Sequence, residues 1–166
     1  MLRKILLVCI SVLLLVICDL SLKKIAREEL KGQPMQVYLG GSLKLIYAEN
    51  SAGMLSLGNK LPERVRLIIF QIYVPVVLVL LFAYTFFKKG TGLLDMVALI
   101  LFLSGGSGNL ISRLTNNGRV IDFMVIEIFN YSTGIFNLAD IYITIGVIVF
   151  IISNVSFKKY YAQPAP

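Results

Sequence analysis

Four apolar stretches, each close to the length needed to cross a membrane, constrain this chain more than any other feature. They cover about residues 5–20, 67–87, 93–111 and 138–155. A spanning helix needs about 20 mostly apolar residues to cross a hydrocarbon core of roughly 30 Å, and 57% of the residues here are hydrophobic. The sequence therefore predicts an integral membrane protein, a single domain over residues 1–166 with four transmembrane helices.

Pairs of basic residues flank these stretches and set their expected orientation. The pairs are Arg3-Lys4, Lys88-Lys89 and Lys158-Lys159. With four crossings, all three pairs fall on one side, which the positive-inside rule assigns to the cytoplasm. We therefore expect both termini inside and residues 21–66 outside. The net charge of +7 is shared between the two surfaces, so phospholipid headgroups are expected partners and nucleic acid is not.

The N-terminal stretch has a competing interpretation as a cleavable signal peptide. Its basic start and its apolar run ending at Cys18 match that pattern, but Ile17 is too large for a position that requires a small residue. We favour an uncleaved first helix. Cys9 and Cys18 lie about 13.5 Å apart along such a helix, too far for a disulfide, and we expect them to be buried thiols.

The largest segment outside the predicted membrane helices lies between the first two. Residues 22–30 favour a helical continuation of the first helix, in which Asp19 and Lys23 share a face and can pair. Residues 35–48 have strand character around a Gly40-Gly41 turn, a pattern typical of a hairpin. The sequence thus predicts a small external sheet within about residues 35–58.

The chain contains no histidine, which removes most hydrolytic chemistries. Neither a Ser-His arrangement nor a histidine zinc helix can form, and we expect no metal and no cofactor. What remains is the pair Asp122 and Asp140, each beside an apolar run. An ionisable group at membrane depth costs roughly 2.5 to 3.5 kcal/mol, so it indicates function. Two carboxyls sharing a site cannot both ionise easily, so one can activate water while the other donates a proton.

Further polar residues lie near these acids in the sequence. Gly105, Asn109 and Arg113 recur at every fourth position, which places them on one face of the third helix. Asn137 and Asp140 are three positions apart and share a face of the fourth. Other interpretations stay open: Gly105 for helix packing alone, Asn137 as a helix N-cap, and Arg113 as an anchor at the headgroups.

Three motifs carry a resemblance to a known family. Residues 105–114, 120–123 and 136–140 together resemble the lipoprotein signal peptidase family, also called signal peptidase II. The Asp19 to Lys23 pattern and the Asn50-Ser51 pair are similar to that family's two upstream motifs. The resemblance covers essentially the whole chain in order. One departure is Ser112, which stands where the family usually has an acid before the arginine and indicates a divergent member.

The resemblance implies an intramembrane aspartyl endopeptidase. The family removes signal peptides from prolipoproteins and cuts N-terminal to a cysteine that carries a diacylglyceryl group. By matching motif positions, Asp122 and Asp140 become the catalytic pair. The residues implied to position substrate and acids are Asn50, Gly105, Asn109, Arg113 and Asn137.

The family fold is an all-α membrane protein: a four-helix transmembrane bundle with a small external β-sheet, called a cradle, and a short external helix. The implied location is the bacterial cytoplasmic (inner) membrane, with the active site near the outer face. Expected ligands are lipid-modified prolipoprotein signal peptides and a cyclic lipopeptide inhibitor of the globomycin type. Residues 123–129 are expected to line the path by which lipid reaches the site.

Two other classes stay open. A small proton-coupled transporter could use Asp122 and Asp140 as a relay, although the sequence shows no internal repeat of the kind common in such proteins. A non-catalytic relative that binds lipidated peptides would keep the same residues, and the sequence does not separate it from a protease.

Overall fold

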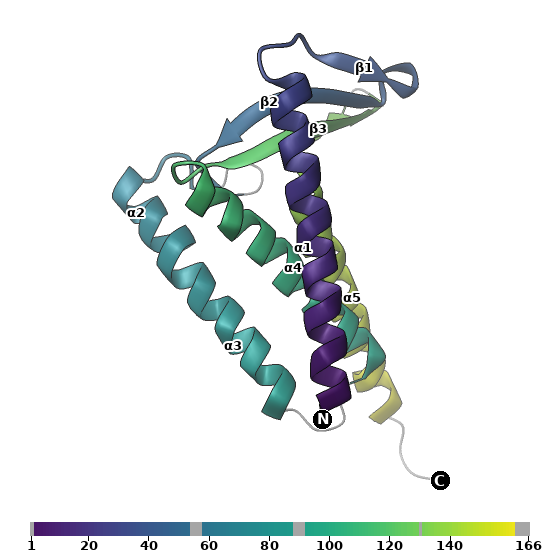
Figure 1. The fold of residues 1–166 in the computed structure, drawn as a ribbon. Coiled ribbons are helices and arrows are strands. Elements are labelled where there is room, and N and C mark those ends of the chain that lie inside the picture. Colours follow the sequence, from purple (N-terminus) through teal and green to yellow (C-terminus); the bar gives the residue numbers. More distant parts are fainter. Residues whose placement is uncertain (1, 54–57, 88–91, 130, 162–166) are drawn as a thin grey trace.

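A bundle of long helices carries a small sheet at one end (Figure 1). The computed structural model describes residues 2–53, 58–87, 92–129 and 131–161. The helices are α1 (Leu2–Leu30), α2 (Glu63–Ile68), α3 (Val74–Phe87), α4 (Leu93–Thr115) and α5 (Leu138–Tyr161). A π-helical turn, Ile69–Tyr73, joins α2 to α3. Within these residues, four helices are long and apolar enough to cross a membrane, with α2 through α3 counted as one.

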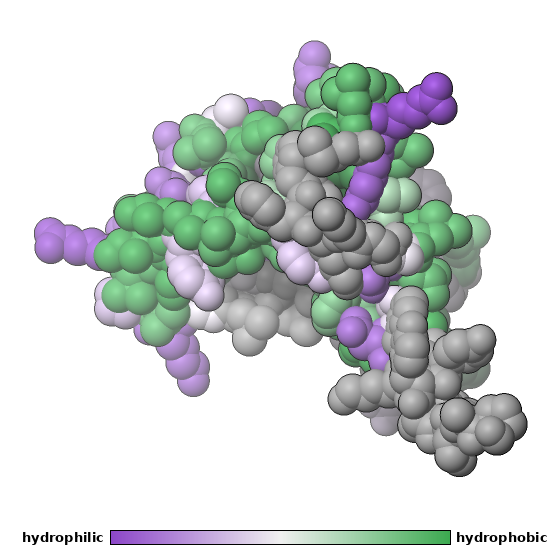
Figure 2. Space-filling view, turned by 90° about the horizontal axis from the view of Figure 1, so that it is seen from below, coloured by the Kyte–Doolittle hydropathy of each residue, from purple (hydrophilic) through white to green (hydrophobic). Residues whose placement is uncertain are grey.

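Helix α4 is the centre of the bundle and packs against α1, α3 and α5. Side chains from α1 and α4 form a core away from the sheet, made of Val8, Leu99, Ile100 and Leu103. Apolar side chains also cover the outside of the helices, among them Leu13, Val79 and Ile151. Figure 2 shows this apolar surface from the end opposite the sheet. Such a surface suits lipid, because a bilayer does not penalise exposed hydrocarbon as water does.

The expectation that both cysteines are buried was wrong. Cys9 and Cys18 are exposed on α1. Hydrophobicity alone predicts burial in a water-soluble protein, but in a membrane helix an apolar side chain can equally face lipid.

The sheet is antiparallel, with strand order β1-β2-β3-β4 in the described part of the chain. The first two strands, β1 (Gln36–Tyr38) and β2 (Leu43–Asn50), form the predicted hairpin around a turn at Leu39–Gly41. Gly40 and Gly41 both have positive φ there, which glycine adopts without strain.

Half of the sheet comes from a region that the sequence did not indicate. Strands β3 (Val120–Ile128) and β4 (Tyr131–Ser132) follow α4 directly, so the sheet extends beyond the predicted 35–58 region. The first four residues of β3 are all buried. A strand covered on both faces need not alternate between apolar and polar residues, and Asp122 and Glu127 interrupt the apolar residues of β3, so its period is uninformative.

The outer turns of α1 pack against the sheet. As predicted, α1 continues without a break to Leu30. Ala26 and Leu30 form a second core with Ile121 and Phe123 of β3. Phe123, expected to line a lipid path, is instead part of this core, whereas Ile128 at the far end of the strand is exposed. This packing holds β3, and with it Asp122, against the helix bundle.

Candidate active site

The structure brings Asp122 and Asp140 together at the sheet end of the bundle. Asp122 lies on β3 and Asp140 in the first turn of α5, and both are buried. Asn137 contacts both: its side-chain amide donates to Oδ1 of Asp122 at 2.6 Å, and its backbone N–H donates to Oδ2 of Asp140 at 3.3 Å. A single asparagine thus connects the two carboxyl groups.

Asn137 also begins helix α5. Its Oδ1 accepts the backbone N–H of Asp140 at 3.1 Å, while Asp140 accepts the backbone N–H of Asn137. This reciprocal pair is a capping box with aspartate in place of glutamate. The N-cap interpretation of Asn137 is therefore confirmed, and the same side chain contacts Asp122 as well. The cap fixes where Asp140 sits relative to the helix end.

Asn50 supplies a second amide to Asp122. It is the last residue of β2, and its Nδ2 donates to Oδ2 of Asp122 at 2.9 Å. Its own Oδ1 accepts the backbone N–H of Ala52 at 2.8 Å, which fixes the orientation of the amide. Burial raises the pKa of Asp122 to about 6; the hydrogen bonds from Asn50 and Asn137 lower it in part, and the charge of Asp140 raises it. Asp122 therefore keeps its proton closer to neutral pH than an exposed aspartate.

Asn109 holds Asp140 from α4. Its Nδ2 donates to Oδ1 of Asp140 at 2.9 Å, and its Oδ1 accepts a hydrogen bond from Lys23 at 2.8 Å. An ammonium group can only donate, so Lys23 forces the oxygen of the Asn109 amide toward itself and the nitrogen toward Asp140.

Lys23 and Asp19 connect to the site through Asn109, although the sequence indicated only that they could pair and that they resemble an upstream family motif. Lys23 donates to Oδ2 of Asp19 at 2.7 Å, and both side chains are almost completely buried. Asp19 also accepts the backbone N–H of Ala139 at 3.0 Å, which joins α1 to the start of α5. The available signal was a pair of opposite charges four residues apart at the end of an apolar run. Charges at membrane depth are costly, and they usually face the protein interior and pair with one another.

The glycines of α4 permit this close arrangement. A Cβ on Gly105 would collide with the backbone oxygen of Ala139, and one on Gly108 would collide with the carboxylate of Asp19. Gly105 therefore allows α4 and α5 to approach, which is the packing role left open from the sequence. Gly108 serves the Asp19–Lys23 pair in the same way.

Arg113 shares a helix face with Asn109 but contacts backbone. It donates to the carbonyl oxygens of Ala52 at 2.8 Å and Asn109 at 3.4 Å, and its guanidinium stacks on Phe70 at 4.2 Å. Its side chain is buried, contrary to a simple headgroup anchor. The neighbouring Ser112 accepts the backbone N–H of Ile121 at 3.4 Å, so the two residues fix the chain on either side of the site.

A cavity of about 250 Å³ opens beside Asp122. Its lining includes Asn50, Ser51, Asn59 and Ile135. It is large enough for a peptide segment or several water molecules, since one water occupies about 30 Å³ in the liquid. Water or a peptide carbonyl in this cavity can therefore reach a carboxyl group whose pKa is raised.

Two buried aspartates, joined through Asn137, lie at the end of a bundle of membrane-length helices, an arrangement that fits an aspartyl protease of the intramembrane class. Comparison with known proteins agrees. The sequence profile of the family described as "Signal peptidase (SPase) II" matches residues 11–156, and the chain belongs to this family.

The relatives cover most of the chain. A lipoprotein signal peptidase of Borrelia duttonii (strain Ly) is 34% identical over 125 residues, which are 73% of this chain and 72% of that protein. A lipoprotein signal peptidase of Staphylococcus haemolyticus (strain JCSC1435) is 40% identical over 84 residues, 51% of this chain and 52% of that protein.

Two solved structures share the fold. One, described as "Bacterial membrane enzyme structure by the in meso method at 2.3 A resolution", has a TM-score of 0.78 and 26% identity, covering 96% of this chain and 93% of that one. A second, described in the same words at 1.9 A, has a TM-score of 0.74 and 29% identity, covering 88% and 90%.

Proposed function

We propose that this protein is an endopeptidase that removes signal peptides from prolipoproteins and cuts N-terminal to a diacylglyceryl-modified cysteine. The observation that carries the proposal is the pairing of Asp122 and Asp140 through Asn137. Membership of the signal peptidase II family and relatives named lipoprotein signal peptidase support the substrate class.

In the proposed reaction the two carboxyl groups share one proton. The ionised carboxylate takes a proton from water, whose oxygen attacks the scissile carbonyl carbon, while the protonated carboxyl donates to the carbonyl oxygen. The tetrahedral intermediate then collapses: the C–N bond breaks, and the leaving amine takes a proton from the protonated carboxyl group. One hydroxyl group of the intermediate gives its proton to the other carboxylate, which restores the singly protonated pair. The raised pKa of Asp122, about 6, supports a pair that still holds one proton at mildly acidic pH, where an exposed aspartate is already ionised.

The remaining predicted residues have distinct proposed roles. Asn50, Asn109 and Asn137 are positioning residues, because each donates to a carboxyl group of the pair. Arg113 would help to position substrate through Ala52, because it holds the carbonyl group of that residue beside the cavity. Gly105 contributes by letting α4 and α5 approach.

We further propose that the protein lies in the bacterial cytoplasmic membrane with both termini cytoplasmic and the site near the outer face. The start of α1 and the end of α5 lie at the end of the bundle opposite the sheet (Figure 1), and the basic pair Arg3-Lys4 lies in the first turn of α1. The apolar outer surface would contact phospholipids, and a cyclic lipopeptide of the globomycin type is a proposed inhibitor of the Asp122 cavity.

A proton-coupled transporter agrees less well with the geometry. Asp140 is the third residue of α5 and Asp122 lies on the sheet. Both acids therefore sit at one end of the bundle, whereas a relay across the membrane needs ionisable groups along the path.

Incubation of the purified protein with a diacylglyceryl-modified precursor tests the proposal. We expect cleavage immediately before the lipidated cysteine, read by mass spectrometry, and no cleavage of the same precursor without the lipid. Binding of the lipidated precursor without cleavage would identify a non-catalytic relative and contradict the proposal.

A further inference from the structure

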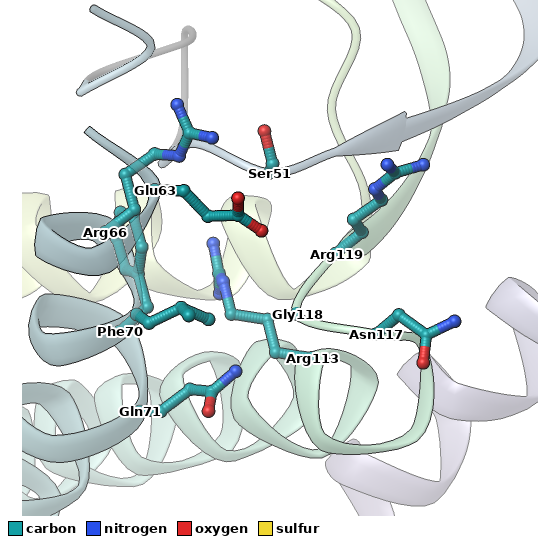
Figure 3. Close-up of a pocket in the computed structure, with 10 residues that line it drawn as sticks. Ser51, Glu63, Arg66, Phe70, Gln71, Arg113, Asn117, Gly118 and Arg119 are labelled. Atoms are coloured by element: carbon teal, nitrogen blue, oxygen red, sulfur yellow. The ribbon is translucent and has the colours of Figure 1, made fainter. Parts of the chain in front are cut away.

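A second cavity, of about 190 Å³, lies between α2 and the end of α4 (Figure 3). Three arginines line it, Arg66, Arg113 and Arg119, with a single carboxylate, that of Glu63. Neither Asp122 nor Asp140 lines it. The charged groups of its lining are thus mainly cationic. The cavity is separate from the one beside Asp122, except that Ser51 borders both.

Arg113 presents an unused donor here. Its side chain is 7% exposed, and its terminal nitrogens donate to backbone carbonyls. Its Nε is buried and has no hydrogen-bond partner among the described residues. Figure 3 shows the guanidinium directed into the cavity, with Glu63 above it. Arginine has no acceptor of its own, and a buried donor is costly to leave unpaired. Because Nε itself is closed to solvent, the guanidinium offers a ligand in the cavity its positive charge.

The cavity also lies at the ends of membrane-length helices, which sets its depth in the membrane. Glu63 and Arg66 are in the first turn of one membrane-length helix, and Arg113 is in the last turn of another. The ends of such helices lie at the level of the lipid headgroups. Guanidinium groups match the geometry and charge of phosphate, and they bind it through two N–H donors at once.

We infer that this cavity binds a phosphate group, supplied by a phospholipid headgroup or by free phosphate. Arg113 attracts it from the buried side, and Arg119, which also donates to Glu49 at 3.3 Å, contributes positive charge from the exposed side. Glu63 opposes the anion and limits its affinity. The site goes beyond the proposed peptidase function, because it requires neither aspartate of the catalytic pair, although it shares Arg113 with the residues proposed to position substrate.

Arginine side-chain NMR of the full-length protein in detergent micelles tests the inference. The signal of the Arg113 Nε–H group is followed in ¹⁵N-arginine-labelled protein and assigned with Arg113→Lys. The probes are inorganic phosphate, dihexanoylphosphatidylglycerol, and dihexanoylglycerol as the matched lipid without phosphate. We expect a saturable shift with a phosphate-containing probe and none with dihexanoylglycerol. Tighter binding of the phospholipid assigns the site to a headgroup, and equal binding assigns it to free phosphate.

Three variants make the test specific. Arg119→Gln should weaken binding roughly fivefold, the effect of one screened charge contact. Glu63→Gln should strengthen it, an effect in the opposite direction that misfolding does not produce. Arg64→Gln is the matched control, because Arg64 is on the same helix but does not line the cavity. The inference is overturned if neither phosphate probe shifts the Arg113 signal, or if Arg119→Gln and Glu63→Gln both bind as the wild type does.

Discussion

The side-chain amide of Asn137 donates to Oδ1 of Asp122 at 2.6 Å, across 15 positions of sequence. This bond ties a residue at the start of a membrane helix to a residue in the middle of a sheet. Because Asn137 also caps α5 through Asp140, any movement of the sheet relative to the helix disturbs both carboxyl groups. The proposed catalytic pair is therefore a property of the sheet–bundle junction.

Replacing either aspartate with asparagine should abolish cleavage. An amide neither takes the proton of water nor returns it, and loss of general acid–base function costs roughly 10²- to 10⁴-fold in rate. Turnover of a lipidated precursor by Asp122→Asn and Asp140→Asn measures this, with gel filtration in detergent to show that both remain folded. Near-normal turnover by either variant rules out the pair.

Asn50→Ala should move the pH–rate profile to higher pH. The bond from Asn50 stabilises the ionised form of Asp122, so its loss raises the pKa of Asp122 above about 6. The limb of the pH–rate profile that reports ionisation of Asp122 then moves to higher pH. Asn59→Ala, which alters the lining of the same cavity, is the control. Superimposed profiles of wild type and Asn50→Ala, or a downward shift, contradict the assignment.

Breaking the buried Asp19–Lys23 pair should destabilise the protein strongly. Lys23→Met or Asp19→Asn leaves a buried charge without its partner, which costs about 3–5 kcal/mol in the free energy of unfolding. The double variant should cost less than the sum of the two. Denaturation in mixed micelles measures this.

The exposed Lys24–Glu28 pair, also four residues apart, provides the control. Lys24→Met should cost less than about 1 kcal/mol. If Lys23→Met costs no more than Lys24→Met, then Lys23 does not organise the site.

Gly105→Ala should disrupt the contact between α4 and α5. The added Cβ meets the backbone oxygen of Ala139, which cannot move without displacing the helix that carries Asp140. Overpacking of this kind costs about 1–3 kcal/mol, and activity should fall with stability. Gly146→Ala is the matched control for Gly105→Ala, because its Cβ would lie on the same interface but 3.3 Å from its nearest neighbours. Equal thermal stability of the two variants would show that α4 and α5 tolerate the extra volume.

The orientation is tested by labelling two exposed leucine positions. In a background without Cys9 and Cys18, Leu2→Cys and Leu39→Cys place thiols where the side chains are 70% and 76% exposed. A membrane-impermeant reagent added to intact cells should label only position 39. Labelling of position 2 alone would invert the proposed topology.

Much of this architecture is encoded locally. Apolar length specifies helices long enough to cross a membrane, and the four-residue spacing places Asn109 and Arg113 on one helix face. The hairpin before Asn50 follows from alternation around two glycines. These features depend on neighbours in sequence, which is why they are readable without coordinates. The aspartates also stand out locally, because few charges interrupt the apolar runs.

Tertiary structure alone decided the rest. Strand β3 is buried at its start by α1 and is interrupted by Asp122 and Glu127, so no period in its own sequence reveals it. Whether Lys23 is solvated or buried depends on Asn109, 86 positions away. The two cysteines face outward because packing, and not polarity, selects which apolar side of a membrane helix meets protein. In each case the deciding contact comes from a distant segment, whose position is settled only when the sheet and the bundle assemble.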